Sequence, residues 1–296
     1  MSQWLTAIVL TFIVMSYNVE NLFHPTQDSL NPDTEFTING SHRWSYTRYN
    51  HKLEHIAQVI ANVDDSHPYL VGLNEVESAQ CLSDLCRKMP HYPYRYLHQD
   101  SPDKRGIDVA LLYDSIRCRI LSSEFMRIPL DSGQTTRDVL YAQTVVDKTD
   151  TLLVFVCHLP SQLSGQQNSR WKREKVKQTI RQKVGTIIDS LLNAKIVVLG
   201  DMNAAPAEDM LPLHNLMLSI PSTEGTHKYQ GIWTCLDQFY VSSALRERVE
   251  VTIFAAPWLQ EEDVRYLGTR PKRTFIGFRY NKNGYSDHLP ILLRIK

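Results

Sequence analysis

Short apolar runs alternate with longer amphipathic segments along nearly the whole chain. The apolar runs are rich in β-branched and aromatic residues and are bounded by turn residues, which is typical of buried strands. This pattern predicts strands at residues 12–17, 70–73, 107–113, 152–158, 196–199, 238–241 and 289–295.

Residues 49–61 and 169–193 predict helices, because their apolar residues recur at helical spacing. The apolar stripe of the second helix comprises Val176, Ile180, Val184, Ile187, Ile188 and Leu191. Its other face carries Lys172, Arg173, Lys175, Lys177, Arg181 and Lys183. Residues 24–48 and 257–285 predict long polar loops. Strands interspersed with helices favour an α/β fold, and the absence of repeats and linkers predicts one domain over residues 1–296.

The composition narrows the class of protein. The 296 residues include 32 Lys+Arg and 32 Asp+Glu, so the formal net charge is zero, and 43% are hydrophobic. A disordered chain would be less hydrophobic and more charged, and a nucleic-acid coat protein would be strongly basic, so both classes are excluded. Five cysteines without C-x-x-C spacing argue against a zinc ribbon, and they exclude a dense disulfide framework in a chain of this length.

Residues 4–15 are mostly apolar and are similar to the hydrophobic part of an export signal. No Lys or Arg precedes them, no small-residue cleavage site follows, and a membrane-spanning helix needs about 20 apolar residues. We expect part of this run to form the first strand, with residues 1–10 as an N-terminal extension or a residual export signal. The cytoplasm is favoured, because the thiols lie in apolar runs, while a periplasmic or secreted location stays open. We expect a monomer without a transmembrane segment.

Polar side chains follow several of the predicted strands at the point where each strand ends. Asn18, Glu75 and His158 end three of them, Asp201 ends a fourth, and residues 286–288 precede the last. Ligands of α/β proteins bind at the carboxyl ends of strands. Carboxylates that gather there are unfavourable unless they meet a cation, and a hard divalent cation prefers oxygen ligands.

Each of these residues taken singly has an ordinary structural explanation. A lone Glu is usually a cap or a surface residue, and Gly200-Asp201-x-Asn203 alone is usually a turn in which both side chains bond their own backbone. Taken together, the residues favour a functional explanation over a structural one, because all of them follow strands and all can bind a metal or a proton.

The same motifs show a family resemblance. In order they are Ser16-Tyr17-Asn18-Val19, Leu73-Asn74-Glu75-Val76, His158, Gly200-Asp201-Met202-Asn203, Leu236-Asp237 and Ser286-Asp287-His288. This set resembles the endonuclease/exonuclease/phosphatase superfamily, the fold group of deoxyribonuclease I, exonuclease III and the sphingomyelinases. Residues 105–113 and 136–138 are similar to a bacterial subgroup of that superfamily.

The resemblance implies a four-layer α/β sandwich, in which two mixed β-sheets pack face to face with helices on the outside. It also implies a metal-dependent phosphoester hydrolase that uses one or two Mg²⁺ or Mn²⁺ ions. Carried over by position, Glu75 would be the principal metal ligand with Asn18 beside it. Asp287 would lie at the same metal or at a second one.

The remaining positions of the resemblance imply the catalytic groups. Asp201 would orient or deprotonate the attacking water, and Asn203 would hold a phosphoryl oxygen. His288 would contact the phosphate while paired with Asp237. His158 would be a second phosphate contact or a general acid.

Arg105 precedes the predicted strand at residues 107–113, and Arg137 precedes a further strand-like run, so we expect both side chains to lie on the same rim of the site. Arginine is well suited to bidentate phosphate contact, although surface ion pairing explains both residues equally well. Gln238 follows Asp237 at a position where many nucleases carry an aromatic or another residue. The sequence therefore does not decide which residue forms the wall of the substrate pocket.

The leading hypothesis is a phosphodiesterase or nuclease that acts on nucleic acid or on a nucleotide-like substrate. A net charge of zero is weak support for duplex DNA as the substrate, because proteins bind DNA non-specifically largely through Lys and Arg. The alternatives are a small-molecule or lipid phosphatase of the phosphoinositide or sphingomyelin type, and a non-catalytic binding module on the same scaffold. A phosphoester is the expected partner in the enzymatic cases.

Overall fold

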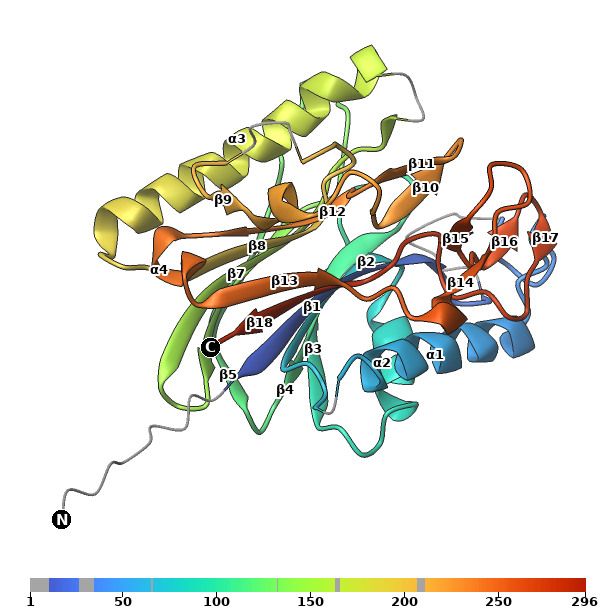
Figure 1. Cartoon of the computed structure of the whole chain (residues 1–296), viewed down its shortest axis with the longest axis horizontal. Helices are drawn as coiled ribbons and strands as arrows, with labels where there is room; N and C mark the ends of the chain where they lie inside the picture. Colours follow the sequence, from blue (N-terminus) through green and yellow to red (C-terminus); the bar gives the residue numbers. More distant parts are fainter. Residues whose placement is uncertain (1–10, 27–34, 65, 132, 163–165, 207–210) are drawn as a thin grey trace.

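The structure, a computed structural model, contains two six-stranded sheets that face each other (Figure 1). It describes residues 11–26, 35–64, 66–131, 133–162, 166–206 and 211–296. The first sheet has the order β13 (Val249–Ile253), β18 (Ile291–Ile295), β1 (Phe12–Leu22), β2 (Leu70–Val76), β4 (Asp108–Asp114) and β3 (Tyr94–His98). The second has the order β5 (Cys118–Met126), β6 (Val139–Val146), β7 (Asp150–His158), β8 (Ile196–Asp201), β12 (Asp237–Val241) and β9 (His214–Asn215).

Both sheets are mixed, because each contains one parallel pair. Strand β1 is parallel to β2, and β7 is parallel to β8, whereas the other neighbouring strands are antiparallel. Parallel strands end at the same edge of a sheet, so each sheet brings two carboxyl ends together. The polar residues that end these strands are therefore placed side by side.

Alternate residues of the strands point to opposite faces of each sheet, which divides the core into three layers. Val14 of β1 and Leu199 of β8 belong to the layer between the sheets. Met15 faces α1 (Tyr46–Ala61) and α2 (Ala79–Arg87) in the first outer layer, and Phe155 faces α3 (Gln166–Ser190) in the second. The order helix, sheet, sheet, helix is the four-layer sandwich that the sequence predicted (Figure 1).

The segment predicted as a polar loop at residues 257–285 instead contains short hairpins. Strands of two or three residues carry too little periodicity to be detected in a sequence. The hairpins are β14 (Gln260–Glu262) with β15 (Thr269–Pro271) and β16 (Phe275–Ile276) with β17 (Arg279–Tyr280). The remaining elements are β10 (His227–Tyr229), β11 (Ile232–Thr234), α4 (Ser243–Arg246), η2 (Leu216–Ser219) and η3 (Pro257–Leu259).

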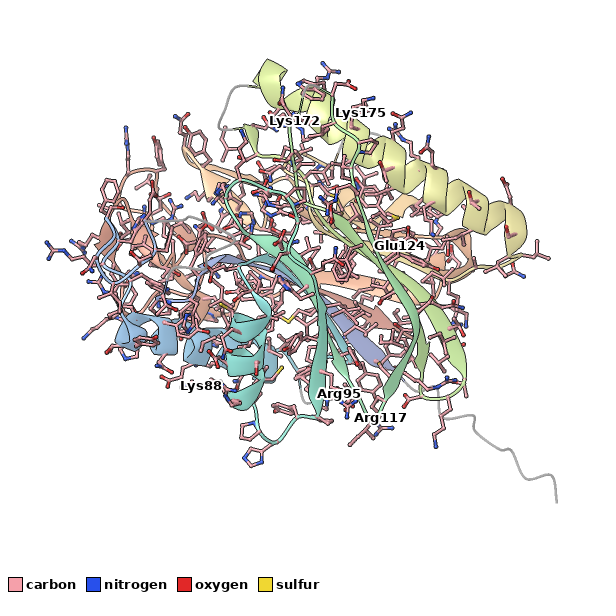
Figure 2. The ribbon with its side chains drawn as sticks, turned by 180° about the vertical axis from the view of Figure 1, so that it is seen from behind. Lys88, Arg95, Arg117, Glu124, Lys172 and Lys175 are labelled. Atoms are coloured by element: carbon pink, nitrogen blue, oxygen red, sulfur yellow. The ribbon has the colours of Figure 1, made fainter. Side chains whose placement is uncertain are left out.

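The long helix α3 differs from its prediction at its C-terminal end and on its cationic face. It ends at Ser190, so Leu191 lies beyond it and is 50% exposed. Of the cations predicted to form this face, Arg173 and Lys177 are buried. Lys172 and Lys175 lie on the same helix (Figure 2). The cationic face is therefore interrupted.

The structure tests part of what the sequence predicted for the N-terminal residues. Strand β1 begins at Phe12, as the apolar run predicted, while residues 1–10 lie outside the described residues. None of the described helices is both long enough and apolar enough to cross a membrane. The five cysteines are free thiols.

Gly200 is required where β7 and β8 approach each other. Its φ is +136°, and a Cβ atom at this position would lie 1.8 Å from the carbonyl oxygen of Cys157. The added Cβ would collide with the backbone of β7. This backbone cannot move without breaking the pairing of β7 with β8 beside His158 and Asp201.

We expect Gly200→Ala to lower the free energy of unfolding by about 3 kcal/mol or more, because overpacking and backbone strain add together. Urea denaturation followed by circular dichroism measures this change. Gly185→Ala is the matched control. A Cβ at Gly185 of α3 meets nothing within 4 Å, so this variant should gain up to about 1 kcal/mol. Equal stability of the two variants would contradict this account of Gly200.

Candidate active site

The predicted site residues come together at the end of the sandwich where the parallel strands finish. Asn18 lies on β1 and Glu75 on β2, while His158 and Asp201 end β7 and β8. Within the second sheet, Asp201 is in register with both His158 and Asp237. Three neighbouring strands thus present three functional side chains in a row, opposite those of the first sheet.

A local distortion of β2 turns Glu75 toward the second sheet. Glu75 has a φ of +68°, and the pairing of β2 with β4 shifts between Asn74 and Val76. The neighbouring β1 is also irregular, and the backbone N–H of Asn21 donates to Glu75 Oε2 at 2.9 Å. Bulges and left-handed residues of this kind re-aim side chains and concentrate at functional sites.

Glu75 and Asp201 are linked across the sheets by Asn18. The Nδ2 atom of Asn18 donates to Asp201 Oδ2 at 3.1 Å and to Glu75 Oε1 at 3.4 Å. His158 Nε2 is 3.6 Å from Asp201 Oδ2 and 3.9 Å from Glu75 Oε1. Burial, with the negative charges of Asp237 and Glu75, raises the pKa of Asp201 to about 7, although His288 opposes the shift.

His288 is held by the buried Asp237. Its Nδ1 donates to Asp237 Oδ2 at 2.6 Å, and its Nε2 is 3.9 Å from Asp201 Oδ2. Burial alone would lower the pKa of His288, but the charge and hydrogen bond of Asp237 and the charge of Asp201 raise it well above its ordinary value. His288 is therefore an imidazolium whose Nε2–H faces the site.

His158 has the opposite character. Burial lowers its pKa well below the ordinary value, and the positive charges of Arg137, Arg105 and His288 lower it further. Its Nδ1 is buried without a hydrogen-bond partner among the described residues. A neutral imidazole and an imidazolium thus lie on either side of Asp201.

Asn203 is placed by a tight turn after β8. It has a φ of +47°, and its backbone N–H donates to Asp201 Oδ1 at 2.8 Å. One hydrogen of its side-chain amide is used by the carbonyl of Leu159, which Nδ2 contacts at 2.9 Å. A side-chain amide carries two N–H donors, so the second hydrogen remains for a ligand.

The two arginines do not form one exposed rim. Arg137 is buried, and its Nε donates to the carbonyl of Ile107 at 3.1 Å. Arg105 is exposed and donates to Asn21 Oδ1 at 2.8 Å. Both charges act on His158, but only Arg105 lies at the surface.

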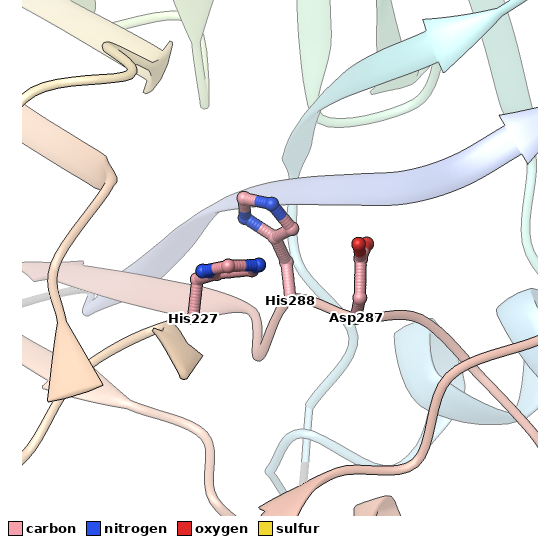
Figure 3. Close-up of side chains that lie close together, drawn as sticks. All are labelled: His227, Asp287 and His288. Carbon is pink, nitrogen blue, oxygen red and sulfur yellow. The ribbon is translucent and has the colours of Figure 1, made fainter. Parts of the chain in front are cut away.

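Asp287 lies on the His288 side of the site and is bound by an arginine. Arg273 Nη2 donates to Asp287 Oδ2 at 2.8 Å. Figure 3 shows Asp287 beside the rings of His288 and His227, and the ligating atoms of these three residues lie within 4.8 Å of one another. Burial would raise the pKa of Asp287, but the charges of His288 and Arg273 lower it to about 2.

Several residues that the sequence reasoning did not single out shape the site. Asn74 is fully buried between the sheets, where its Nδ2 donates to Cys157 O and its Oδ1 accepts the N–H of Asp201. Ser286 donates to the carbonyl of Asn18 at 2.7 Å and so fixes the segment that carries His288. The motifs around Glu75 and His288 already contained Asn74 and Ser286, and this adjacency was the available signal.

His227 could not have been found from the sequence. It lies 61 residues before His288 in the chain, yet the two form an isolated β-bridge with ring centroids 4.9 Å apart. Gln238, whose role the sequence left open, is fully buried and donates to the carbonyls of Ala204 and Cys235. It braces the turn after β8 and does not form a wall of the site.

The donor set of Glu75 and Asp201 fits a hard divalent cation. Two carboxylates face each other, and the pKa of Asp201 is raised first by burial and then by the negative charges of Asp237 and Glu75, which a divalent cation would offset. Asn18 presents its Nδ2 to them, because its Oδ1 accepts the N–H of Glu20 at 3.0 Å. Ligation by Asn18 would therefore require its amide to turn over. The His227, Asp287 and His288 group fits a cation poorly, because His288 is protonated and bound to Asp237.

The sequence matches the model of the Endonuclease/Exonuclease/phosphatase family over residues 13–296. The chain belongs to this family. Membership supports phosphoester hydrolysis, in general terms, as its activity. A comparison with curated proteins finds no match.

Solved structures show the same fold at low sequence identity. Truncated TDP2 from Caenorhabditis elegans has a TM-score of 0.62 at 17% identity and covers 96% of this chain and 97% of its own. The human nocturnin catalytic domain with bound sulfate has a TM-score of 0.61 at 16% identity, with 97% and 94% coverage. A mannosyl-6-phosphatase from Bacteroides thetaiotaomicron has a TM-score of 0.62 at 15% identity, with 96% and 100% coverage.

The buried Asp201 predicts how stability depends on pH when divalent cations are removed. Its pKa is about 7 in the folded protein and 3.8 without the surrounding structure, so the folded state binds the proton more tightly. The contribution of Asp201 to the free energy of unfolding should therefore decrease as pH rises from 3.8 to about 7. Asp201→Asn cannot ionise, so in EDTA at pH 8 it should be more stable than the wild type by at least about 1 kcal/mol.

Urea denaturation in EDTA at pH 5 and pH 8 checks this expectation. The difference between Asp201→Asn and the wild type should shrink at pH 5, where both side chains are neutral. Asp131→Asn, on the exposed surface, is the control and should follow the wild type at both pH values. Parallel pH profiles for Asp201→Asn and the wild type would contradict the assignment.

Proposed function

We propose that this chain is a divalent-metal-dependent phosphodiesterase, with nucleic acid or a nucleotide-like molecule as substrate. One observation carries the proposal: two facing carboxylates, Glu75 and Asp201, lie beside an imidazolium, His288, and a neutral imidazole, His158. Cation ligands, a proton acceptor and anion donors thus converge on one point, which is the set that phosphoester hydrolysis requires.

Glu75 would hold a Mg²⁺ or Mn²⁺ ion, with Asn18 contributing after its amide turns over. Such an ion neutralises negative charge on the phosphoryl and leaving oxygens of the substrate. Asp287 is a weaker candidate ligand, because Arg273 already binds its carboxylate.

Asp201 is the proton acceptor of the proposed reaction. Burial raises the pKa of Asp201 to about 7 without a cation, and a cation beside Glu75 would lower it, so Asp201 would be ionised and able to accept a proton at neutral pH. Its Oδ1 accepts the N–H of Asn203 and its Oδ2 accepts the amide of Asn18, so the turn of the Asn18 amide that metal ligation requires would free Oδ2 to take a proton from water. The turn after β8 thereby aims one particular oxygen into the site.

Three donors would stabilise the charge that develops on the phosphoryl oxygens. His288 offers Nε2–H as an imidazolium, and Asp237 prevents the ring from rotating. Asn203 offers its second amide hydrogen, and the neutral His158 offers one ring nitrogen as donor or acceptor. Donors fixed before the reaction lower the barrier, because they do not reorganise during it.

A substrate panel tests the proposal and separates it from the alternatives. Bis-p-nitrophenyl phosphate, p-nitrophenyl phosphate, a single-stranded oligonucleotide and phosphoinositide vesicles are each incubated with Mn²⁺ or with EDTA. We expect Mn²⁺-dependent cleavage of the diester and the oligonucleotide. Turnover confined to monoesters or lipids would favour a phosphatase, and no metal-dependent turnover would favour a binding module.

Removal of the principal metal ligand should abolish activity without unfolding the protein. We expect Glu75→Gln to lose at least 10²-fold in kcat and to bind Mn²⁺ more weakly by calorimetry, while its metal-free melting temperature does not fall. The control is Glu250→Gln, which changes an exposed glutamate on β13. Full Mn²⁺ affinity in Glu75→Gln would refute this assignment of Glu75.

The two histidines should act on the transition state more than on substrate affinity. We expect His158→Ala and His288→Ala each to lower kcat by about 10² or more with little change in KM, since each removes one fixed donor. The double variant should lose less than the product of the single losses, because both groups act on one phosphoryl group. Steady-state kinetics measure these effects. A kcat near that of the wild type would show that the altered histidine is structural.

A further inference from the structure

Two grooves lead away from the candidate active site, and they share one residue, Arg273. The first, which we call the His227 groove, has a volume of 300 Å³ and is lined by His227, Lys228, Arg265, Arg270, Arg273 and Asp287, among others. The second, the Phe275 groove, has a volume of 640 Å³ and is lined by Asn21, Phe23, Phe36, Arg105, Arg273 and Phe275, among others.

Each groove begins at a different part of the site. The Phe275 groove includes Asn21, whose backbone N–H contacts Glu75. The His227 groove includes His227 and Asp287, which lie beside His288 (Figure 3). Asn21 therefore connects the Phe275 groove with Glu75, and Asp287 connects the His227 groove with His288.

The side chain of Arg273 is fixed and yet open to both grooves. It is 42% exposed, and Nη2 donates to Asp287 while Nε lies 3.8 Å from the buried Glu20. A surface arginine usually keeps its rotamer freedom, and ordering it costs free energy. Two carboxylates have already ordered this guanidinium, and its remaining N–H donors are left for a ligand.

The backbone around Arg273 is equally constrained. The N–H of Thr274 donates to Glu20 Oε2 at 2.6 Å, and Lys52 Nζ donates to both Thr274 Oγ1 and the carbonyl of Tyr285. A Cβ at Gly284 would lie 2.1 Å from the carbonyl oxygen of Arg273, so these two segments are in close contact. Helix α1, strand β1 and the segment before His288 together hold Arg273 in place.

The two grooves differ in chemistry. The floor of the Phe275 groove contains Phe23, Phe36 and Phe275, and Phe36 stacks on Phe23 with ring centroids 4.6 Å apart. The lining of the His227 groove is rich in cations, which are partly balanced by Asp263 and Asp287. The Phe275 groove therefore offers aromatic rings beside charged groups, and the His227 groove offers mainly cations and tyrosines.

We propose that the two grooves receive the two ester groups of a phosphodiester, and that Arg273 binds the diester oxygens from the wall between the grooves. The assignment rests on the proposed function and makes it more specific. A monoester has one organic group and would fill one groove, whereas a diester has two. The planar guanidinium can contact two phosphate oxygens at once, which a lysine cannot do.

Equilibrium binding tests this assignment independently of catalysis. All proteins carry Asp201→Asn, which removes the proposed base and its charge, and binding is measured by calorimetry with Mg²⁺ at pH 7.5. The ligands are thymidylyl-thymidine, which has one internal diester, and thymidine 5′-monophosphate, which has one monoester. The monoester carries more negative charge, so charge alone would favour it.

We expect the diester to bind at least 10-fold more tightly than the monoester. Arg273→Gln should weaken diester binding at least 10-fold, the usual effect of losing a charge-assisted contact. Arg273→Lys keeps the charge beside Asp287 and should give a smaller loss. Arg246→Gln removes an exposed arginine of α4 and should bind like the parent. Melting temperatures show which variants are folded.

Two results would overturn the assignment. Monoester binding equal to or tighter than diester binding would show that the second groove takes no ester group. Diester binding unchanged in Arg273→Gln, or equal to the parent in Arg273→Lys if the Gln variant does not fold, would remove Arg273 from the site. Failure of the hydrolase proposal appears separately, as absent turnover of the wild type in the substrate panel.

Discussion

The side chain of Asn74 joins the two sheets at the level of the facing carboxylates Glu75 and Asp201. Asn74 precedes Glu75 on β2, accepts the N–H of Asp201 and donates to the carbonyl of Cys157 near the end of β7. Because both partners are buried backbone groups, loss of this amide would leave a donor and an acceptor unpaired between the sheets. The separation of Glu75 from Asp201, and with it the proposed chemistry, depends on this contact.

Charge balance organises the rest of the site. Asp237 is paired with His288, and Asp287 is paired with Arg273, whereas Glu75 and Asp201 share the amide of Asn18 and no histidine nitrogen lies closer to either than 3.6 Å among the described residues. A buried charge is tolerated when it is paired, so the unbalanced pair marks the place where a cation would be most favourable. The paired carboxylates orient cationic side chains toward the substrate.

Much of the fold could be predicted because its central strands are continuously apolar, as buried strands must be. Of the strands that were missed, β3, β5, β6 and β13 are more exposed or alternate in polarity, while β9 to β11 and the hairpins β14 to β17 are too short to show a period. Helix α1 begins three residues before its prediction, after the cap at Ser45, because its first turn carries no apolar stripe.

The apolar runs were enough to predict that His158 and Asp201 end strands and that Glu75 lies next to the end of β2. Asn18 instead lies inside β1, which continues to Leu22. Only the tertiary structure decided which charged side chains pair with one another. Arg273 stands close to Arg270 and Lys272 in the sequence, yet it binds Asp287 between two grooves, and His227 meets His288 through a single β-bridge. Such contacts join segments that are distant in sequence, and their physical basis is packing and charge pairing between layers, which no local pattern contains.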